Sequence, residues 1–126
     1  MEVKIDTKEK LHVITILNEL LAANMTAAME ECLIPYLQND VKNIVFNLNN
    51  VKQVEEVAAE QLVKIQQLFY EKGASFVICG LQPAVETALE NNHLLELMNV
   101  TPTESEAWDI VQMEEIEREL LGDEGF

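Results

Sequence analysis

Residues 41–62 read VKNIVFNLNNVKQVEEVAAEQL, and this stretch decides the fold. Its first eight residues form a nearly continuous apolar run, which is typical of a strand covered on both faces of a sheet. Polar turn residues follow, and a helix is predicted to begin at the adjacent acids Glu55 and Glu56. A buried strand that leads through a short turn into a helix indicates an α/β fold.

Strands and helices alternate on both sides of this stretch. Segments 2–5 and 11–17 predict an opening hairpin, 74–81 predicts a second buried strand, and 96–101 supplies a last short strand. Helices that join such strands form right-handed crossovers between parallel neighbours. The sequence therefore predicts a mixed β-sheet of four to five strands, with parallel central strands and a face covered by about four helices. We expect residues 1–126 to form a single domain.

The first two helices have recognisable ends. The first is predicted to follow Asn24, a candidate N-cap, and to end near Asn39. Pro35 lies inside it, so we expect a kink or a shifted boundary there, because an interior proline removes a backbone donor. The second helix is predicted over 56–70, and Gly73 ends it.

The last two helices carry their own start signals. Pro83 suits the first position of the third helix, and Thr103 with Glu106 has the spacing of a capping box that opens the fourth. Trp108 is expected to be a core residue, and the acidic segment 110–126 to be a solvated helical face and tail; a docking surface is the alternative. The predicted inward positions of the third helix are Val85, Ala88 and Leu89, and the apolar positions of the fourth are Ala107, Ile110, Val111, Met113, Ile116 and Leu120.

The charge balance restricts the class of partner. Eight Lys plus Arg stand against 23 Asp plus Glu, which gives a formal net charge of −15. Such a chain repels the phosphates of nucleic acids and anionic membrane surfaces. No apolar run approaches the roughly 18 residues that span a bilayer, and the first residues lack the apolar core of a signal peptide. We therefore expect a cytoplasmic protein without nucleic-acid binding or membrane insertion.

Residue types that carry chemistry are sparse. Cys32 and Cys79 stand in apolar contexts without a CxxC pattern, which favours buried free thiols. His12 and His93 are isolated, so neither a metal nor a cofactor is expected. Glycine motifs for nucleotides and the GxSxG elbow are missing from the sequence. A helix N-terminus lowers the pKa of a carboxylate, opposite to what a general acid needs, so we expect no catalytic residue and no enzyme.

Several stretches together resemble one known family, the STAS domain, which is the fold of bacterial anti-sigma-factor antagonists. The resemblance extends from about Val3 to Val111 and rests on the order and spacing of its parts. Those parts are LNEL at 17–20, TAAMEECL at 26–33, KNIVFNLNNV at 42–51 and GASFVICGLQPAVETAL at 73–89.

The chain departs from that family at its regulatory loop. The family carries Asp-Ser-Ser-Gly-Leu where the strand meets the helix, and a partner kinase that also acts as the anti-sigma factor phosphorylates the first serine. Here residues 55–59 read EEVAA, and Glu56 stands at the position of that serine. Residues 47–74 contain no Ser or Thr, so this segment cannot accept a phosphate on either residue type. The family's Asp after Glu-Leu is replaced by Leu21.

The two acids have two interpretations at this point. Carboxylates in the first turn of a helix are favoured by typically about 0.3 to 1 kcal/mol, which accounts for both residues without any function. The alternative hypothesis is that Glu56, helped by Glu55, holds the loop permanently in a phosphorylated-like charge state.

The resemblance implies a non-enzymatic regulatory module that docks residues 49–62 onto another protein. The implied partner is an anti-sigma factor or serine kinase of the histidine-kinase-like ATPase fold, and the implied consequence is release of a sigma factor. Acidic and polar side chains would suit a basic rim on that partner. The alternative is a STAS-like accessory subunit of a membrane transporter or signalling scaffold, and the oligomeric state is open. The predicted partner-binding residues are Asn50, Gln53, Glu55, Glu56 and Glu60.

Overall fold

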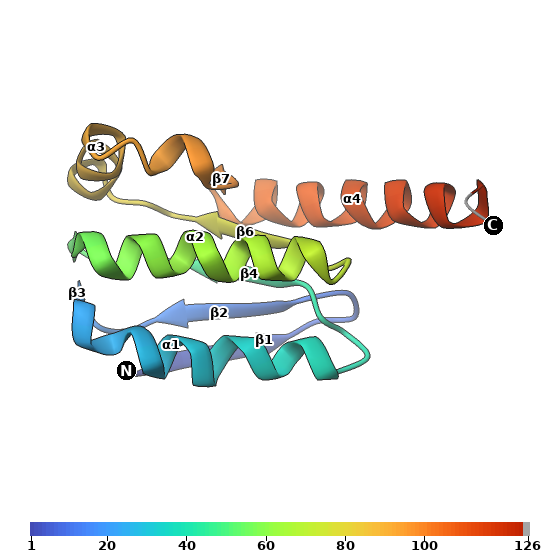
Figure 1. Cartoon of the computed structure of the whole chain (residues 1–126), viewed down its shortest axis with the longest axis horizontal. Helices are drawn as coiled ribbons and strands as arrows, with labels where there is room; N and C mark the ends of the chain where they lie inside the picture. Colours follow the sequence, from blue (N-terminus) through green and yellow to red (C-terminus); the bar gives the residue numbers. More distant parts are fainter. Residues whose placement is uncertain (125–126) are drawn as a thin grey trace.

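The computed structural model describes residues 1–124, which are built around a five-stranded sheet in the order β1-β2-β4-β6-β7 (Figure 1). β1 runs antiparallel to β2, and every other pair of neighbours is parallel. The predicted hairpin and the parallel centre of the sheet are therefore confirmed. The strands are β1 (Val3–Thr7), β2 (His12–Ile16), β4 (Ile44–Asn47), β6 (Phe76–Cys79) and β7 (Val100–Thr101).

Alternating side chains of the central strands supply two cores. In β4, Ile44 and Phe46 belong to one core and Val45 to the other, and all three are fully buried. This alternation follows from the two-residue period of a strand. Helices α1 (Thr26–Leu33) and α2 (Glu56–Glu71) cover the first face, while α4 (Glu104–Glu124) contributes its apolar residues to the second. The prediction that β4 is covered on both faces is confirmed.

The first helical region is divided into three pieces. A 3-10 turn, η1 (Ala23–Met25), precedes α1, and a second, η2 (Ile34–Gln38), follows it. Pro35 lies in the first turn of η2, so the predicted boundary shift is confirmed. The prediction of Asn24 as N-cap is wrong, because Asn24 lies inside η1 and Met25 takes the cap position of α1.

The end of α2 confirms the role predicted for Gly73. Its φ of 74° is left-handed, a conformation in which glycine has no side-chain penalty. The N–H of Gly73 donates to the carbonyl of Tyr70 at 3.1 Å, and the N–H of Ala74 donates to the carbonyl of Phe69 at 2.9 Å. These two bonds make a Schellman motif, which satisfies the last carbonyl groups of the helix and turns the chain toward β6.

Helix α3 (Pro83–Asn91) begins at its proline as predicted. Val85 and Leu89 are buried, but the prediction for Ala88 is wrong, because this short helix packs through a narrow stripe and Ala88 lies outside it. The strand expected at 96–101 is reduced to the two residues of β7, because the 3-10 turn η3 (Leu95–Leu97) takes up the start of that segment.

Helix α4 begins with the predicted capping interaction. The N–H of Glu106 donates to Oγ1 of Thr103 at 3.2 Å, and the same hydroxyl lies 3.2 Å from the Glu106 carboxylate. Trp108 is only partly buried at the edge of the second core, with the Nζ of Lys8 5.6 Å from its ring centroid. Within residues 1–124, no helix combines the length and apolar content needed to cross a bilayer.

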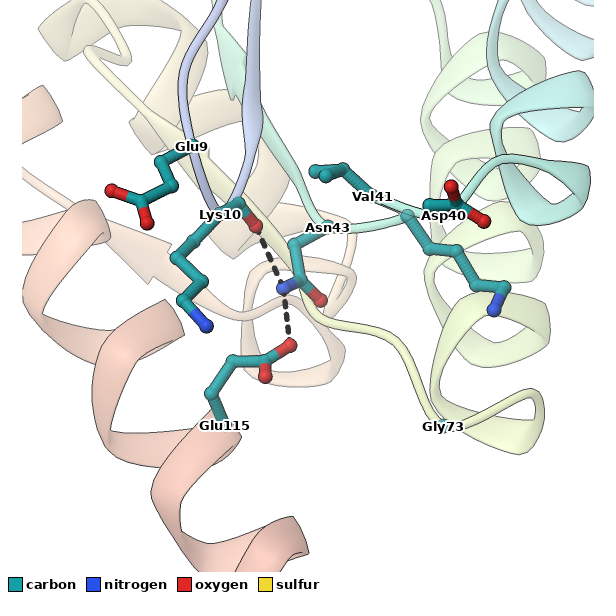
Figure 2. A pocket seen from close by; sticks show the side chains of 8 residues that line it. Glu9, Lys10, Asp40, Val41, Asn43, Gly73 and Glu115 are labelled. Atoms are coloured by element: carbon teal, nitrogen blue, oxygen red, sulfur yellow. Dashed lines mark hydrogen bonds between the residues drawn. The ribbon is translucent and has the colours of Figure 1, made fainter.

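Asn43, the residue directly before β4, is hydrogen-bonded to three other parts of the chain (Figure 2). Its Nδ2 donates to the carbonyl of Lys10 at 3.0 Å and to Oε1 of Glu115 at 2.7 Å. Its Oδ1 accepts the N–H of Ser75 at 2.8 Å and a longer bond from Arg118 at 3.2 Å. The side chain is 3% exposed, so one buried amide ties α4 to the turn between β1 and β2 and to the start of β6.

Candidate functional site

The candidate site lies at the carboxyl edge of the parallel strands, where the segments after β2 and β4 pair with each other. β3 (Leu20–Leu21) and β5 (Gln53–Val54) form a separate two-stranded parallel sheet. The Glu19 carbonyl accepts N–H groups from Lys52 at 2.7 Å and from Gln53 at 3.2 Å. The sequence did not predict these strands, because two residues are too short to show a period. The pairing fixes the loop that leads into α2.

Glu55 has a structural task at this edge. Its N–H donates to the carbonyl of Leu21 at 2.9 Å, and its Oε1 accepts the N–H of Ala23 at 2.7 Å. Leu21 is fully buried in the first core, so the segment around residues 21–23, to which Glu55 bonds, is also held by core packing. The carboxylate of Glu55 is therefore engaged within the chain.

Asn50 also bonds within the chain. Its Nδ2 donates to the carbonyl of Ile16, at the end of β2, at 3.2 Å. Lys52 and Glu19 form an ion pair nearby, but both side chains are about two-thirds exposed, so the pair adds little stability. Side chain and backbone together therefore hold the β4–α2 loop against the β2–β3 loop.

Three of the predicted binding residues are free to meet another molecule. Gln53, Glu56 and Glu60 are exposed, and within the described chain their side chains have no hydrogen-bond partner. Glu56 is the first residue of α2, directly after the N-cap Glu55. The helix beneath them packs closely, because residues 58 and 59 are fully buried alanines.

Exposed apolar side chains at this edge were not among the predicted site residues. Leu17, Leu20 and Val57 are between 42% and 54% exposed, and they belong to the segment after β2, to β3 and to the first turn of α2. The sequence does contain a signal for this exposure, because Leu20 and Leu21 are adjacent apolar residues. Adjacent residues of a strand point to opposite faces, so only one of the two can point into the core. We call the following set the carboxyl-edge surface: Leu17, Leu20, Asn50, Gln53, Glu55, Glu56, Val57 and Glu60.

A glycine supports this surface from the β6 side. Gly80 has a φ of 75°, and a Cβ added there would lie 2.9 Å from Oδ1 of Asn47. That same Oδ1 accepts the N–H of Asn49 at 2.9 Å, and Nε2 of Gln82 donates to the Asn49 carbonyl at 3.0 Å. The loop after β4 therefore rests closely on the loop after β6, which leaves no room for a side chain at Gly80.

The remaining reactive residue types are engaged in packing. His12 is 6% exposed, bonds the carbonyl of Val41 through Nε2 at 2.9 Å and contacts the ring of Tyr36. Cys79 is buried and Cys32 is half-buried; burial raises the pKa of both thiols, that of Cys79 to about 12. Among residues 1–121, whose side chains the structure describes, no group of three or more His, Cys, Asp or Glu side chains is placed to hold a metal ion.

The pocket in Figure 2 lies at the opposite, amino edge of the sheet and mixes charges of both signs. Glu9, Asp40 and Glu115 line it together with Lys10 and Lys42. The hydrogen bond from Asn43 lowers the pKa of Glu115, which is opposite to the shift that a general acid requires. The pocket therefore offers no argument for acid catalysis.

Comparisons with known proteins agree with this architecture. The model of the family described as "STAS domain" matches residues 2–107. An anti-sigma factor antagonist from Mycobacterium paratuberculosis superposes with a TM-score of 0.75 at 14% identity, covering 88% of this chain and 93% of that one. A variant of RsbS from Moorella thermoacetica, with glutamate in place of a serine, gives 0.72 at 22% identity, covering 89% and 96%.

A larger protein contains the same fold as one of its parts. The murine anion transporter Slc26a9 matches with a TM-score of 0.68 at 15% identity, over 82% of this chain but 18% of the transporter. None of the curated protein sequences matches the chain. Since the family model matches residues 2–107, which is most of its length, the chain belongs to the STAS domain family.

Proposed function

We propose that this protein is a non-enzymatic regulatory module that binds another protein through the carboxyl-edge surface. The observation that carries the proposal is the combination of exposed apolar side chains with free carboxylates on a rigid edge. Leu17, Leu20 and Val57 supply the apolar part, and Glu56 and Glu60 the acidic part. An apolar centre with a polar rim is the usual anatomy of a protein interface.

The proposed partner is an anti-sigma factor or serine kinase of the histidine-kinase-like ATPase fold, with release of a sigma factor as the consequence. Support comes from the family membership and from the match to an anti-sigma factor antagonist. The acidic surface favours a partner with a basic rim, because complementary charges speed encounter and select the correct partner.

Glu56 is proposed to supply a fixed negative charge where relatives carry a modifiable serine. A phosphate brings about −1.5 to −2 charges and three acceptor oxygens, so a single carboxylate reproduces it only in part. Glu55 adds charge nearby, but its carboxylate is already bonded to Ala23. The charge-mimic hypothesis therefore rests on Glu56, the acid of the pair without a partner inside the described chain.

Calorimetric titration against purified kinase-fold anti-sigma factors from the same genome tests the partner class. We expect a complex at low salt and a change of about fivefold or more in Kd for Glu56→Ala, which corresponds to about 1 kcal/mol. Glu71→Ala is the matched control, because it removes the same charge from the exposed far end of α2. The absence of any complex would reject this partner class, and equal effects of the two substitutions would reject the role of Glu56.

The apolar part of the surface needs its own variant. Val57→Ser replaces an exposed apolar side chain in the first turn of α2 with a small polar one and leaves the charges unchanged. We expect weaker binding with unchanged thermal unfolding, because Val57 is 54% exposed and contributes little to the core. Binding that depends on Glu56 but not on Val57 would mean that charge alone makes the contact.

A second candidate function is an accessory subunit of a transporter or signalling scaffold. The specific observation in its favour is the match to one part of an anion transporter. In that case the surface would meet a permanent neighbour and no kinase. A permease or ATPase gene beside this one would favour the accessory subunit, whereas a kinase-fold gene would favour the regulator.

A further inference from the structure

Helix α4 has two sides with different tasks. Ala107 and Val111 are buried against the sheet, and one turn further Oε1 of Glu114 accepts the Tyr70 hydroxyl at 2.8 Å while Glu115 accepts from Asn43. At about 100° per residue, these positions lie on one side of the helix. Over residues 107–118 that side holds α4 to the rest of the chain.

The opposite side of the same helix carries exposed apolar residues in its second half. Met113, Ile116 and Leu120 are 57%, 57% and 59% exposed. Their spacing of three and four residues places them in one stripe, about half a turn away from Val111. We call these three residues the outer stripe. An apolar side chain exposed singly is ordinary, but three aligned on one helix face form a contiguous contact strip.

The outer stripe begins near the middle of α4 and continues toward its C-terminal end. Figure 1 shows the C-terminal half of α4 projecting beyond the sheet and the other helices. Seven residues before Met113 and Ile116, the corresponding positions are Glu106 and Asp109, so the same face is acidic in the first half of α4 and apolar in the second half. The apolar stripe is therefore confined to the second half of the helix.

The spacing of the outer stripe is that of a helix-pairing seam. Met113, Ile116 and Leu120 occupy consecutive a, d and a positions of a heptad. The flanking e and g positions, which decide the choice of partner in paired helices, carry Glu117 and Glu119. Both acids are exposed and form no ion pair within the described chain.

The acids beside the outer stripe restrict which kind of molecule can bind there. Arg118 is the single basic residue of α4 and turns inward to Glu115 and Asn43, so it cannot offset the flanking acids. Lys10 lines a pocket with Ile116 and Glu119, but Glu9 and Glu115 line the same pocket, so the rim stays acidic. Two copies of the chain would bring Glu117 and Glu119 against like charges, with a net charge of −15 on each copy. Anionic lipid is disfavoured for the same reason. A helix with apolar a and d positions and Lys or Arg beside them fits both the seam and its rim.

We propose that the outer stripe of α4 is a docking site for a basic amphipathic helix of another protein. The carboxyl-edge surface lies at the N-terminal end of α2, whereas the outer stripe lies at the other end of the molecule (Figure 1). Both surfaces can therefore be occupied at once, which would let this module connect two proteins.

The test uses a fluorescent model helix with Leu at a and d and Lys at e and g, titrated with the protein in fluorescence anisotropy. We expect saturable binding, at least tenfold weaker for Leu120→Ser combined with Ile116→Ser. Those substitutions leave the charge unchanged, so attraction by net charge alone would survive them. Because both side chains are exposed, the variant should unfold at the wild-type temperature, and circular dichroism checks this.

Charge reversal supplies the second arm. Exchanging Glu117 and Glu119 for Lys should transfer preference to a model helix with Glu at e and g. Equal binding by the wild type and the double serine variant would overturn the proposal, as would no preference for the basic helix. A wild-type dimer in analytical ultracentrifugation that becomes a monomer in Leu120→Ser would identify a second copy of the chain as the binding partner. That result would also overturn the proposal. Binding to phosphatidylglycerol vesicles lost in the double serine variant would do the same in favour of lipid.

Discussion

The N–H of Ala23 and the Oε1 of Glu55 are 2.7 Å apart, and this bond joins the segment after β3 to the cap position of α2. Glu56, the next residue, carries the same charge and has no partner within residues 1–124. Two adjacent acids that are indistinguishable by type thus have different surroundings. One is part of the scaffold of the carboxyl-edge surface, and the other is available to a partner.

The first prediction separates the two acids by stability. Glu55→Ala removes the acceptor of Ala23 and should lower the free energy of unfolding by about 1 kcal/mol, the usual net contribution of a hydrogen bond. Glu56→Ala should have a smaller effect, because it removes only the interaction of a charge with the helix N-terminus. Urea unfolding followed by circular dichroism measures both. Glu55→Gln keeps an acceptor oxygen and is the control; equal losses for the alanine variants would contradict the assignment.

The second prediction concerns Gly80, which links the loop after β6 to the carboxyl-edge surface. Gly80→Ala forces a side chain into a left-handed φ and places its Cβ 2.9 Å from Oδ1 of Asn47. We expect a loss of roughly 1 to 3 kcal/mol, the usual range for backbone strain of this kind. Amide exchange should also increase in the loop that contains Asn49. A stable variant with unchanged exchange would mean that the contact between the loops yields at little cost.

The third prediction uses two helix ends with the same geometry. His93 has a φ of 60°, and its N–H and that of Leu94 bond the carbonyls of Glu90 and Leu89 at 3.1 and 3.0 Å, as Gly73 and Ala74 do at the end of α2. A non-glycine residue in this conformation costs roughly 1 kcal/mol. His93→Gly should therefore raise the unfolding temperature.

The matched variant at α2 should act in the opposite direction. An added Cβ at Gly73 meets nothing within 4 Å, so Gly73→Ala tests the backbone alone and should cost about 1 kcal/mol. Differential scanning calorimetry of both variants measures the two shifts. Shifts of the same sign would show that side-chain contacts, and not backbone conformation, dominate at one of these positions.

The fourth prediction addresses the buried amide of Asn43. Asn43→Ala leaves the buried N–H of Ser75 and the partly buried carbonyl of Lys10 without their partner, and each buried unsatisfied group costs about 1 to 3 kcal/mol. We expect a total loss of at least about 2 kcal/mol in chemical denaturation. Gln38→Ala is the control, because it truncates a polar side chain of similar type on η2. Gln38 makes no hydrogen bond to Asn43 in the described chain.

The strands and α2 could be predicted because their residues carry the physical signal locally. Ile44, Val45 and Phe46 are apolar on both sides of the strand, and the core contains all three. Gly73 ends α2 because the left-handed turn requires a residue without a side chain. In these cases the side chain itself determines the local structure.

The missed features depend on contacts between distant segments. β3 and β5 exist because Glu19 and Leu21 accept backbone N–H groups from residues more than thirty positions away, which no local pattern reveals. The role of Glu55 likewise follows from Ala23 and not from its neighbours. In α4 the sequence pattern predicts a single set of apolar positions, but the structure divides them between the sheet and an exposed face, since Val111 and Ile116 lie on different sides of the helix.

The last prediction concerns acid stability and Glu115. The hydrogen bond from Asn43, followed by the nearby charge of Arg118, lowers the pKa of this carboxyl from an ordinary value of about 4.5. A carboxyl with a lower pKa in the folded state stabilises the fold fully above its unfolded pKa, and this contribution is lost as the pH falls through the folded pKa. The loss should therefore occur below about pH 4.5 and not in the neutral range.

Glu115→Gln removes this titration and identifies its share. The variant should be less stable than the wild type at pH 7, and the difference in unfolding free energy should shrink as the pH falls below about 4.5. Urea denaturation at a series of pH values gives the difference directly. Glu117→Gln is the control, because it removes a carboxylate from the same helix where no hydrogen bond is made in the described chain. A difference for Glu115→Gln that stays constant down to pH 3 would show that the charge of Glu115 is not what the Asn43 amide recognises.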